Sequence, residues 1–165
     1  MNYQFLANTR LFRGISVDEL EKMLACFSVQ TRQYEKGSLI LRAGQTVSAI
    51  GLVLSGNITI ENNDLWGNRT VMDRLGAGAI FAESYALTPE EILMVDIVAN
   101  EPTEVLFLQT RAILNPCQKS CYSHRALLGN LLAISSQKNL HMSRHILHTS
   151  PKTIRGRLLS YLSFL

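Results

Sequence analysis

The chain has 165 residues, enough for one domain with a substantial core, and its 47% hydrophobic content is typical of folded rather than disordered proteins. No apolar run reaches the roughly 18 residues that a membrane-spanning helix needs, and the N-terminus lacks a secretory pattern, so we expect a cytoplasmic protein without a membrane role. The net charge of +3 is mild, but residues 111–165 are rich in Lys, Arg and His and contain no Asp or Glu. That basic third is compatible with either DNA or an acidic partner surface.

Two short helices are expected at the N-terminus. Ser16 and Glu19 form a capping-box pattern, in which a hydroxyl at the N-cap is followed three residues later by a carboxylate. Apolar residues then recur at helical spacing, at Val17, Leu20, Met23, Leu24 and Phe27. We therefore predict a helix over about 16–26 and another short helix over 3–12.

From residue 28 onward the pattern changes to that of short strands. Seven segments suit strands, namely Val29–Tyr34, Leu39–Arg42, Ala49–Leu54, Asn57–Glu61, Thr70–Leu75, Ile92–Ala99 and Thr103–Leu108. Glycines or polar clusters separate many of them, and glycine supplies the positive φ that tight turns need. Short strands at this rhythm predict a barrel or a double-layered roll.

After residue 109 the pattern is helical again, with a short helix at Thr110–Leu114 and a long one over about 119–148. A heptad seam runs along the long helix through Leu128, Leu132, Ser135, Asn139, Met142 and Ile146. A second apolar edge is formed by Leu127, Leu131 and Ile134. The two edges either face the β-roll and the twin helix of a second subunit, or both belong to one intramolecular core.

One more helix is predicted over Thr153–Leu165. Ser150 and Pro151 suit its N-cap and first helical position. Its apolar side carries Ile154, Leu158, Leu159, Leu162 and Leu165. Because the sequence stops in mid-pattern without a C-cap signal, we expect the chain to be truncated.

The tract Gly76–Ser84, followed by the apolar run Ile92–Ala99, resembles the phosphate-binding cassette of the cyclic-nucleotide-binding domain. Four further pieces, in the same order as in that family, extend the resemblance: Leu11–Ile15, Gly37–Gln45, Leu52–Gly56 and Thr153–Leu159. Together they make the chain, from about residue 10 to 165, similar to the sensor half of the cyclic-AMP receptor protein/FNR (Crp/Fnr) family of bacterial transcription regulators.

This resemblance implies a mainly β fold with flanking helices, a double-stranded β-helix or jelly-roll-like β-roll, followed by a long C-terminal dimerisation helix. It divides the chain into a sensor domain over 1–118, the dimerisation helix over 119–149 and the first helix of a DNA-binding domain over 150–165. In the family a winged helix-turn-helix follows, so DNA binding is expected only through a module beyond Leu165.

The resemblance also assigns a ligand pocket, at Phe81, Ala82, Glu83, Ser84, Leu93, Met94, Asn139 and His141. Glu83 stands where the family has a ribose-binding Glu. Ala82, however, replaces the glycine beside the phosphate, and Leu93 and Met94 replace the Arg and Ser that hold it. Losing such a desolvated bidentate contact costs roughly 2–5 kcal/mol. We therefore expect no tight binding of cyclic AMP or cyclic GMP, and the effector is unknown.

Simpler interpretations of these residues stay open. Glu83 is equally well explained as a carboxylate that complements a helix N-terminus. Leu93 and Met94 fit the ordinary core of a roll. A displaced cation could come from Arg69, Arg74 or Arg111.

Cysteine and histidine spacing raises the possibility of a metal site. Three residues are spaced i, i+4, i+7, at Cys117, Cys121 and His124, and the spacing recurs at His141, His145 and His148. On a continuous helix either set offers three donors to a metal ion. The alternatives are a pair of small buried thiols and a solvated or interface histidine face. Three cysteines in the chain predict no structural disulfide framework.

These observations favour the effector-sensing domain of a Crp/Fnr-type regulator that forms a homodimer through the long helix and binds an unknown small-molecule effector. The alternatives are a stand-alone dimeric ligand-binding module, or a metal or redox sensor that uses Cys117 and Cys121. We predict no enzymatic activity, because the sequence has no nucleophile elbow, P-loop, zincin or carboxylate-dyad pattern.

Overall fold

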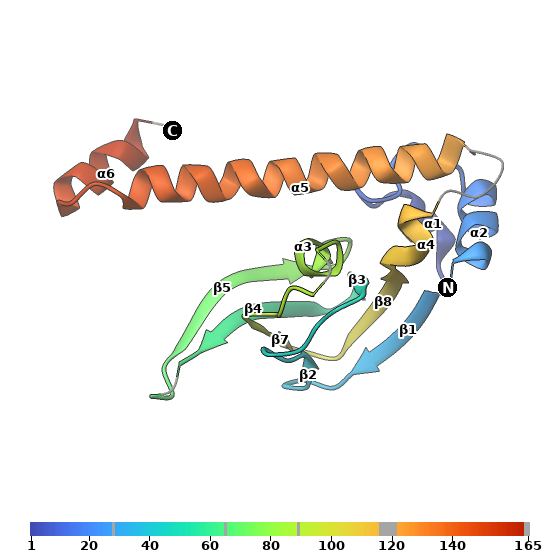
Figure 1. The fold of residues 1–165 in the computed structure, drawn as a ribbon, viewed down its shortest axis with the longest axis horizontal. Coiled ribbons are helices and arrows are strands. Elements are labelled where there is room, and N and C mark those ends of the chain that lie inside the picture. The colour runs from blue at the N-terminus through green and yellow to red at the C-terminus, as the bar shows by residue number, and fades with distance from the viewer. Residues whose placement is uncertain (28, 65, 89, 116–121, 164–165) are drawn as a thin grey trace. The chain divides into compact units, whose positions relative to one another are not determined.

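A computed structural model gives the fold (Figure 1), and it describes residues 1–27, 29–64, 66–88, 90–115 and 122–163. The chain forms two compact units, Met1–Asn130 and Leu131–Leu165, and the long helix α5 (Tyr122–Thr149) passes from one into the other. The predicted functional division at residues 118 and 149 is a different one and stays a prediction. Within the described segments, no helix combines the length and the apolarity that a bilayer crossing requires.

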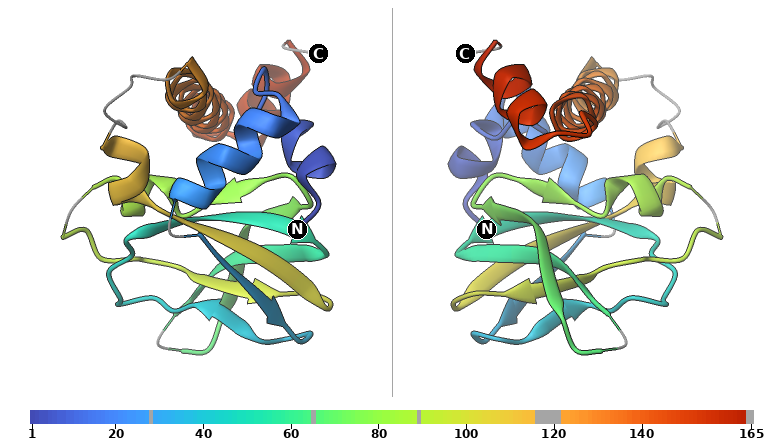
Figure 2. Two further views of the ribbon diagram at one scale, coloured as in Figure 1. Left: turned by 90° about the vertical axis from the view of Figure 1, so that its right-hand side faces the viewer. Right: turned by 90° about the vertical axis from the view of Figure 1, so that its left-hand side faces the viewer.

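The first unit is built on two four-stranded sheets that face each other (Figure 2). One sheet has the order β1 (Val29–Tyr34), β8 (Thr103–Gln109), β3 (Ala49–Ser55), β6 (Ile80–Phe81). The other has the order β2 (Leu39–Leu41), β7 (Asp96–Ala99), β4 (Asn57–Asn63), β5 (Arg69–Gly76). Neighbouring strands are antiparallel throughout both sheets. The predicted mainly β roll with flanking helices is confirmed.

Two strands differ from the sequence-based expectation. The two-residue strand β6 is too short to show a period, so the residues gave no signal for it. The strand expected over Ile92–Ala99 begins only at Asp96. Before that point the backbone of Leu93 is hydrogen-bonded to the turn at Gly44 and Gln45. Its N–H donates to the Gln45 carbonyl (2.9 Å), and its carbonyl accepts from the Gly44 N–H (2.8 Å).

Helices flank the roll where they were expected, with two corrections. The helix α2 (Val17–Cys26) has the predicted capping box, and α4 (Thr110–Leu114) has the predicted bounds. The first helix, α1 (Tyr3–Ala7), is shorter than the predicted 3–12, because the Asn8 side-chain amide donates to the Gln4 carbonyl (2.9 Å) and the chain turns away there.

The last helix also begins later than predicted. α6 (Ile154–Leu162) has Thr153 as its N-cap, whose hydroxyl accepts from the Gly156 N–H (3.1 Å). Ser150 is instead hydrogen-bonded to the preceding helix, because its hydroxyl donates to the Ile146 carbonyl near the end of α5 (2.5 Å). Ser150 and Pro151 are therefore part of the joint between the helices rather than the start of α6.

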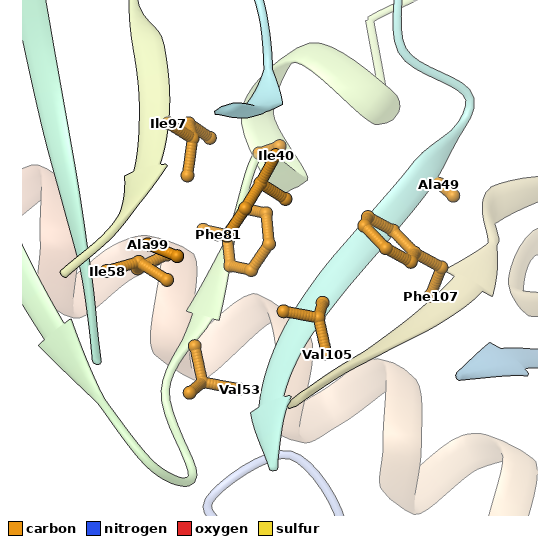
Figure 3. Packing of buried hydrophobic residues seen from close by; sticks show 10 residues of the cluster. Ile40, Ala49, Val53, Ile58, Phe81, Ile97, Ala99, Val105 and Phe107 are labelled. Atoms are coloured by element: carbon orange, nitrogen blue, oxygen red, sulfur yellow. The ribbon is translucent and has the colours of Figure 1, made fainter. Parts of the chain in front are cut away.

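The core of the roll lies between the two sheets and centres on Phe81 (Figure 3). The Phe81 ring meets Phe107 edge to face at 6.2 Å, which is a favoured geometry for aromatic pairs. Behind it lies Gly51, which pairs with Phe81 in the sheet. A Cβ at Gly51 would come within 2.1 Å of the Phe81 ring, so only a glycine leaves room for the ring.

Replacing Gly51 with Ala is therefore expected to lower the free energy of unfolding by about 1–3 kcal/mol, because the ring must move out of a packed core. Chemical denaturation followed by circular dichroism measures the effect. The matched control is Gly76→Ala, at a strand glycine where a Cβ meets nothing within 4 Å. Equal stability of the two variants would contradict the packing argument.

Candidate functional site

The predicted cassette opening folds as a strand, one left-handed residue and a helical turn. β6 ends at Phe81, Ala82 has φ 60° and ψ 10°, and α3 (Glu83–Ala86) follows at once. The Ala86 N–H donates to the Ala82 carbonyl (2.9 Å), which closes the turn. Phe81 is anchored in the core, so the position of this turn is set by the packing of the roll.

Ala82 occupies the left-handed region without being a glycine. Only glycine adopts this conformation at no steric cost, and other residues lose roughly 1–2 kcal/mol there. Ala82 is also buried, so its methyl group adds apolar surface next to the start of α3. The backbone at position 82 thus has a conformation that favours glycine, although the residue there is alanine.

The acidic and hydroxyl residues of the cassette have different environments. Glu83 is the first residue of α3 and is only 3% exposed, whereas Ser84 is exposed. The burial of Glu83 fits both interpretations of it, a ligand-binding carboxylate and a group that complements the helix start. The choice between them stays open.

The segment that faces a phosphate in the family is apolar in this chain. Leu93 is 1% exposed and lies in the core, as the simpler interpretation expects. The same interpretation is wrong for Met94, which is 69% exposed and so fills no part of the core. Two neighbouring residues with opposite exposure fit an extended backbone, in which successive side chains point to opposite faces.

The stretch of sequence that includes the cassette contains no Lys or Arg. From Leu75 to Thr110 the sequence has no Lys or Arg, but it has six acidic residues, Glu83, Glu90, Glu91, Asp96, Glu101 and Glu104. Of the three arginines considered as a displaced cation, Arg69 pairs with the buried carboxylate of Glu61 (2.5 Å). Arg74 and Arg111 are exposed. This stretch of sequence therefore carries an excess of negative charge.

The remaining predicted pocket residues lie in the second unit. Asn139 and His141 are on α5, where both are exposed. Their assignment to the same pocket as the cassette stays a prediction. Most residues of the heptad seam are also exposed, while Leu128 and Ser135 are half-buried.

The metal hypothesis is not tested for its cysteines. Cys117 and Cys121 lie outside the described residues. His124 is buried, its Nε2 atom is 2.5 Å from the Ile113 carbonyl oxygen, and its ring packs edge to face on Phe27. Within the described segments, no group of three or more His, Cys, Asp or Glu residues could hold a metal ion.

The structure also shows a supporting residue that sequence reasoning missed. The Asp96 carboxylate accepts from the Ala43 N–H (2.8 Å) and from the Asn63 side-chain amide (3.1 Å). It therefore fixes the turn to which Leu93 is bonded. A single aspartate at the start of a strand gives no local signal for this role, since its partners are more than 30 residues away in sequence.

Replacing Ala82 with Gly is expected to raise the free energy of unfolding by about 0.5–1 kcal/mol, because relief of the left-handed strain exceeds the entropy that glycine loses on folding. The control is Ala86→Gly in α3, which has a helical conformation and should lose stability. Thermal or chemical denaturation compares the two. A less stable Ala82→Gly variant would contradict the strain at this residue.

Comparison with known proteins gives the family. The family model described as "Cyclic nucleotide-binding domain" matches residues 31–120. A relative, the cyclic AMP receptor protein of Thermus thermophilus, is 34% identical over 98 residues, which cover 59% of this chain and 44% of the relative. This chain therefore spans less than half of that relative's length.

Solved structures show the same fold. The Thermus thermophilus catabolite activator protein has a TM-score of 0.69 at 26% identity, with 84% of this chain and 62% of that chain covered. The sensor domain of the transcriptional regulator DNR from Pseudomonas aeruginosa has a TM-score of 0.62 at 21% identity, with 92% of this chain and 93% of that chain covered. The chain thus belongs to the cyclic nucleotide-binding domain family, in its Crp/Fnr branch.

Proposed function

We propose that this chain is the effector-sensing part of a Crp/Fnr-type transcription regulator whose effector is not a cyclic nucleotide. The observation that carries the proposal is the combination of a folded cassette backbone with a complete lack of cations from Leu75 to Thr110. The relatives are named a cyclic AMP receptor and a transcriptional regulator. DNA binding is assigned to a module outside these residues.

Electrostatics supports the exclusion of cyclic nucleotides. A phosphate taken out of water needs a paired cation or several hydrogen bonds to offset its desolvation. The position that pairs with the phosphate in the family is Leu93, a core side chain. The methyl group of Ala82 further hinders close approach to the backbone at the start of α3.

Burial supports a homodimer through α5. Among the described residues from Leu131 onward, only Leu131 and Ile134 are buried. Ten large apolar residues of this second unit are exposed, namely Leu132, Leu140, Met142, Ile146, Leu147, Ile154, Leu158, Leu159, Tyr161 and Leu162. An isolated helix gains little stability in water, so most of its stability must come from packing. A twin helix on the heptad seam supplies that packing.

In the proposed mechanism, effector binding at the roll favours one packing arrangement of α5 over another. A ligand shifts such an equilibrium only by its difference in affinity for the two states. The change in helix packing then reorients the DNA-binding modules that follow.

Isothermal titration calorimetry is expected to show no binding of cyclic AMP or cyclic GMP when the nucleotide is at micromolar concentration. The physical reason is the missing cation at Leu93. The Thermus thermophilus cyclic AMP receptor protein serves as the positive control. A dissociation constant in the micromolar range or below for this chain would overturn the exclusion of cyclic nucleotides.

The double variant Leu132→Lys, Met142→Lys is expected to be monomeric in sedimentation analysis, because it places two charges in the seam of a helix pair. Both side chains are more than 60% exposed in the single chain, so the substitutions should leave the fold of the roll intact. The matched control is Leu140→Lys, since Leu140 is exposed on the same helix but lies roughly 120° away from the seam. A dimer that survives the double change would refute the interface.

A further inference from the structure

Two polar residues interrupt the apolar seam of α5. The seam is formed at alternating spacings of four and three residues by Leu128, Leu132, Ser135, Asn139, Met142 and Ile146. With Leu132 at a heptad a position, Ser135 falls at d and Asn139 at the next a. Asn139 is exposed in the single chain, as are its apolar seam neighbours Leu132 and Met142. A partner that covers this seam therefore also covers an amide.

The charges of α5 favour a second copy of the same helix as that partner. From Leu128 to Thr149 the sequence has two Lys or Arg residues, Lys138 and Arg144, and neither is in the seam. They lie roughly 100° and 140° from Asn139 around the helix. An identical helix can therefore lie along the seam without placing like charges directly opposite each other. An acidic partner would instead be drawn to the charged sides of the helix.

A pair of α5 helices lacks the usual electrostatic control of register. In coiled coils, oppositely charged residues at the flanking e and g positions form interhelical salt bridges that set partner choice and orientation. The e and g positions beside this seam hold Gly129, Leu131, Ser136, Lys138, Ser143 and His145. Residues 111–165 contain no Asp or Glu, so two copies of α5 cannot form such a salt bridge with each other. The register must then be set by the seam itself.

Only a polar seam residue separates the correct register from a slipped one. In register, the two copies of Asn139 meet across a two-fold axis, where each amide can donate to the other and accept from it. A slip of one heptad places one Asn139 opposite Leu132 and the other opposite Ile146, and both amides lose their partner. A buried amide without a partner should lower the population of the slipped pair by roughly 10–100-fold.

We propose that Asn139 is the specificity-determining residue of the α5 pair, which holds two copies of this chain in a single register and limits the assembly to two helices. The inference rests on the proposed homodimer and adds the residue that fixes its pairing. An asparagine at an a position selects register and oligomeric state at a cost in affinity, because an amide is buried where an apolar side chain would pack. Selection and affinity should therefore change in opposite directions when Asn139 is replaced.

The test is Asn139→Leu, followed by sedimentation equilibrium and by the methyl signals of 13C-labelled methionine. Met142 is the only methionine of α5 and lies in the seam, so its methyl group reports the register. The wild-type chain should be a dimer with one Met142 signal. Asn139→Leu should associate with a dissociation constant roughly 10-fold lower. It should also form more than one species, seen as extra Met142 signals or as assemblies larger than a dimer.

The matched control is Gln137→Leu, which adds the same side chain at an exposed residue roughly 160° from Asn139 around the helix. This variant should remain one dimer with one Met142 signal. A rescue variant, Leu132→Asn with Asn139→Leu, moves the amide to the neighbouring a position and should restore a single dimer. If the rescue variant stays heterogeneous, a polar layer is not what selects the register, and the proposal fails.

Two results with Asn139→Leu itself would overturn the proposal. One is an exclusively dimeric variant with a single Met142 signal, since the amide would then select nothing. The other is dissociation into monomers, because Asn139 would then supply affinity rather than selection. A monomeric wild-type chain would instead refute the proposed homodimer. Failure of the two ideas is therefore distinguishable, and circular dichroism of each variant checks that the roll is folded.

Discussion

The structure depends on the fit of the Phe81 ring against Gly51. This contact joins β3 to β6, fills the space between the two sheets and fixes the residue from which the cassette starts. A side chain at Gly51 would occupy the place of the ring, and a smaller residue at Phe81 would leave a cavity that costs several kcal/mol. The cassette is thereby held by the roll core, whatever its own residues can bind.

That dependence separates the fold of the roll from the chemistry of the cassette. Phe81 and the backbone turn at Ala82 belong to the core and its connection, so they are under structural constraint. A phosphate-binding arginine at the Leu93 position contributes to binding and not to the core, and in an unliganded roll a buried guanidinium is costly. Leu93 is buried in this chain and offers no charge to an anion, which supports the proposed exclusion of cyclic nucleotides.

The sequence predicted the architecture well, because most strands are long enough to show a period and the capping box of α2 is a local pattern. The sequence does not predict β6 because two residues have no period, and the predicted start of α6 is too early because the Ser150 hydroxyl donates backward to the Ile146 carbonyl. The cassette residues came from the resemblance, not from the pattern. The roles of Gly51 and Asp96 could not be predicted, since each depends on a partner that is distant in sequence.

The second unit buries few of its apolar side chains. Among its described residues only two are buried, so little apolar packing from within fixes its conformation. In the proposed homodimer, the exposed apolar residues of this unit pack on the partner helix. In the proposed mechanism α5 is the element that carries a change at the roll to the residues after it, since Tyr122–Thr149 form one continuous helix.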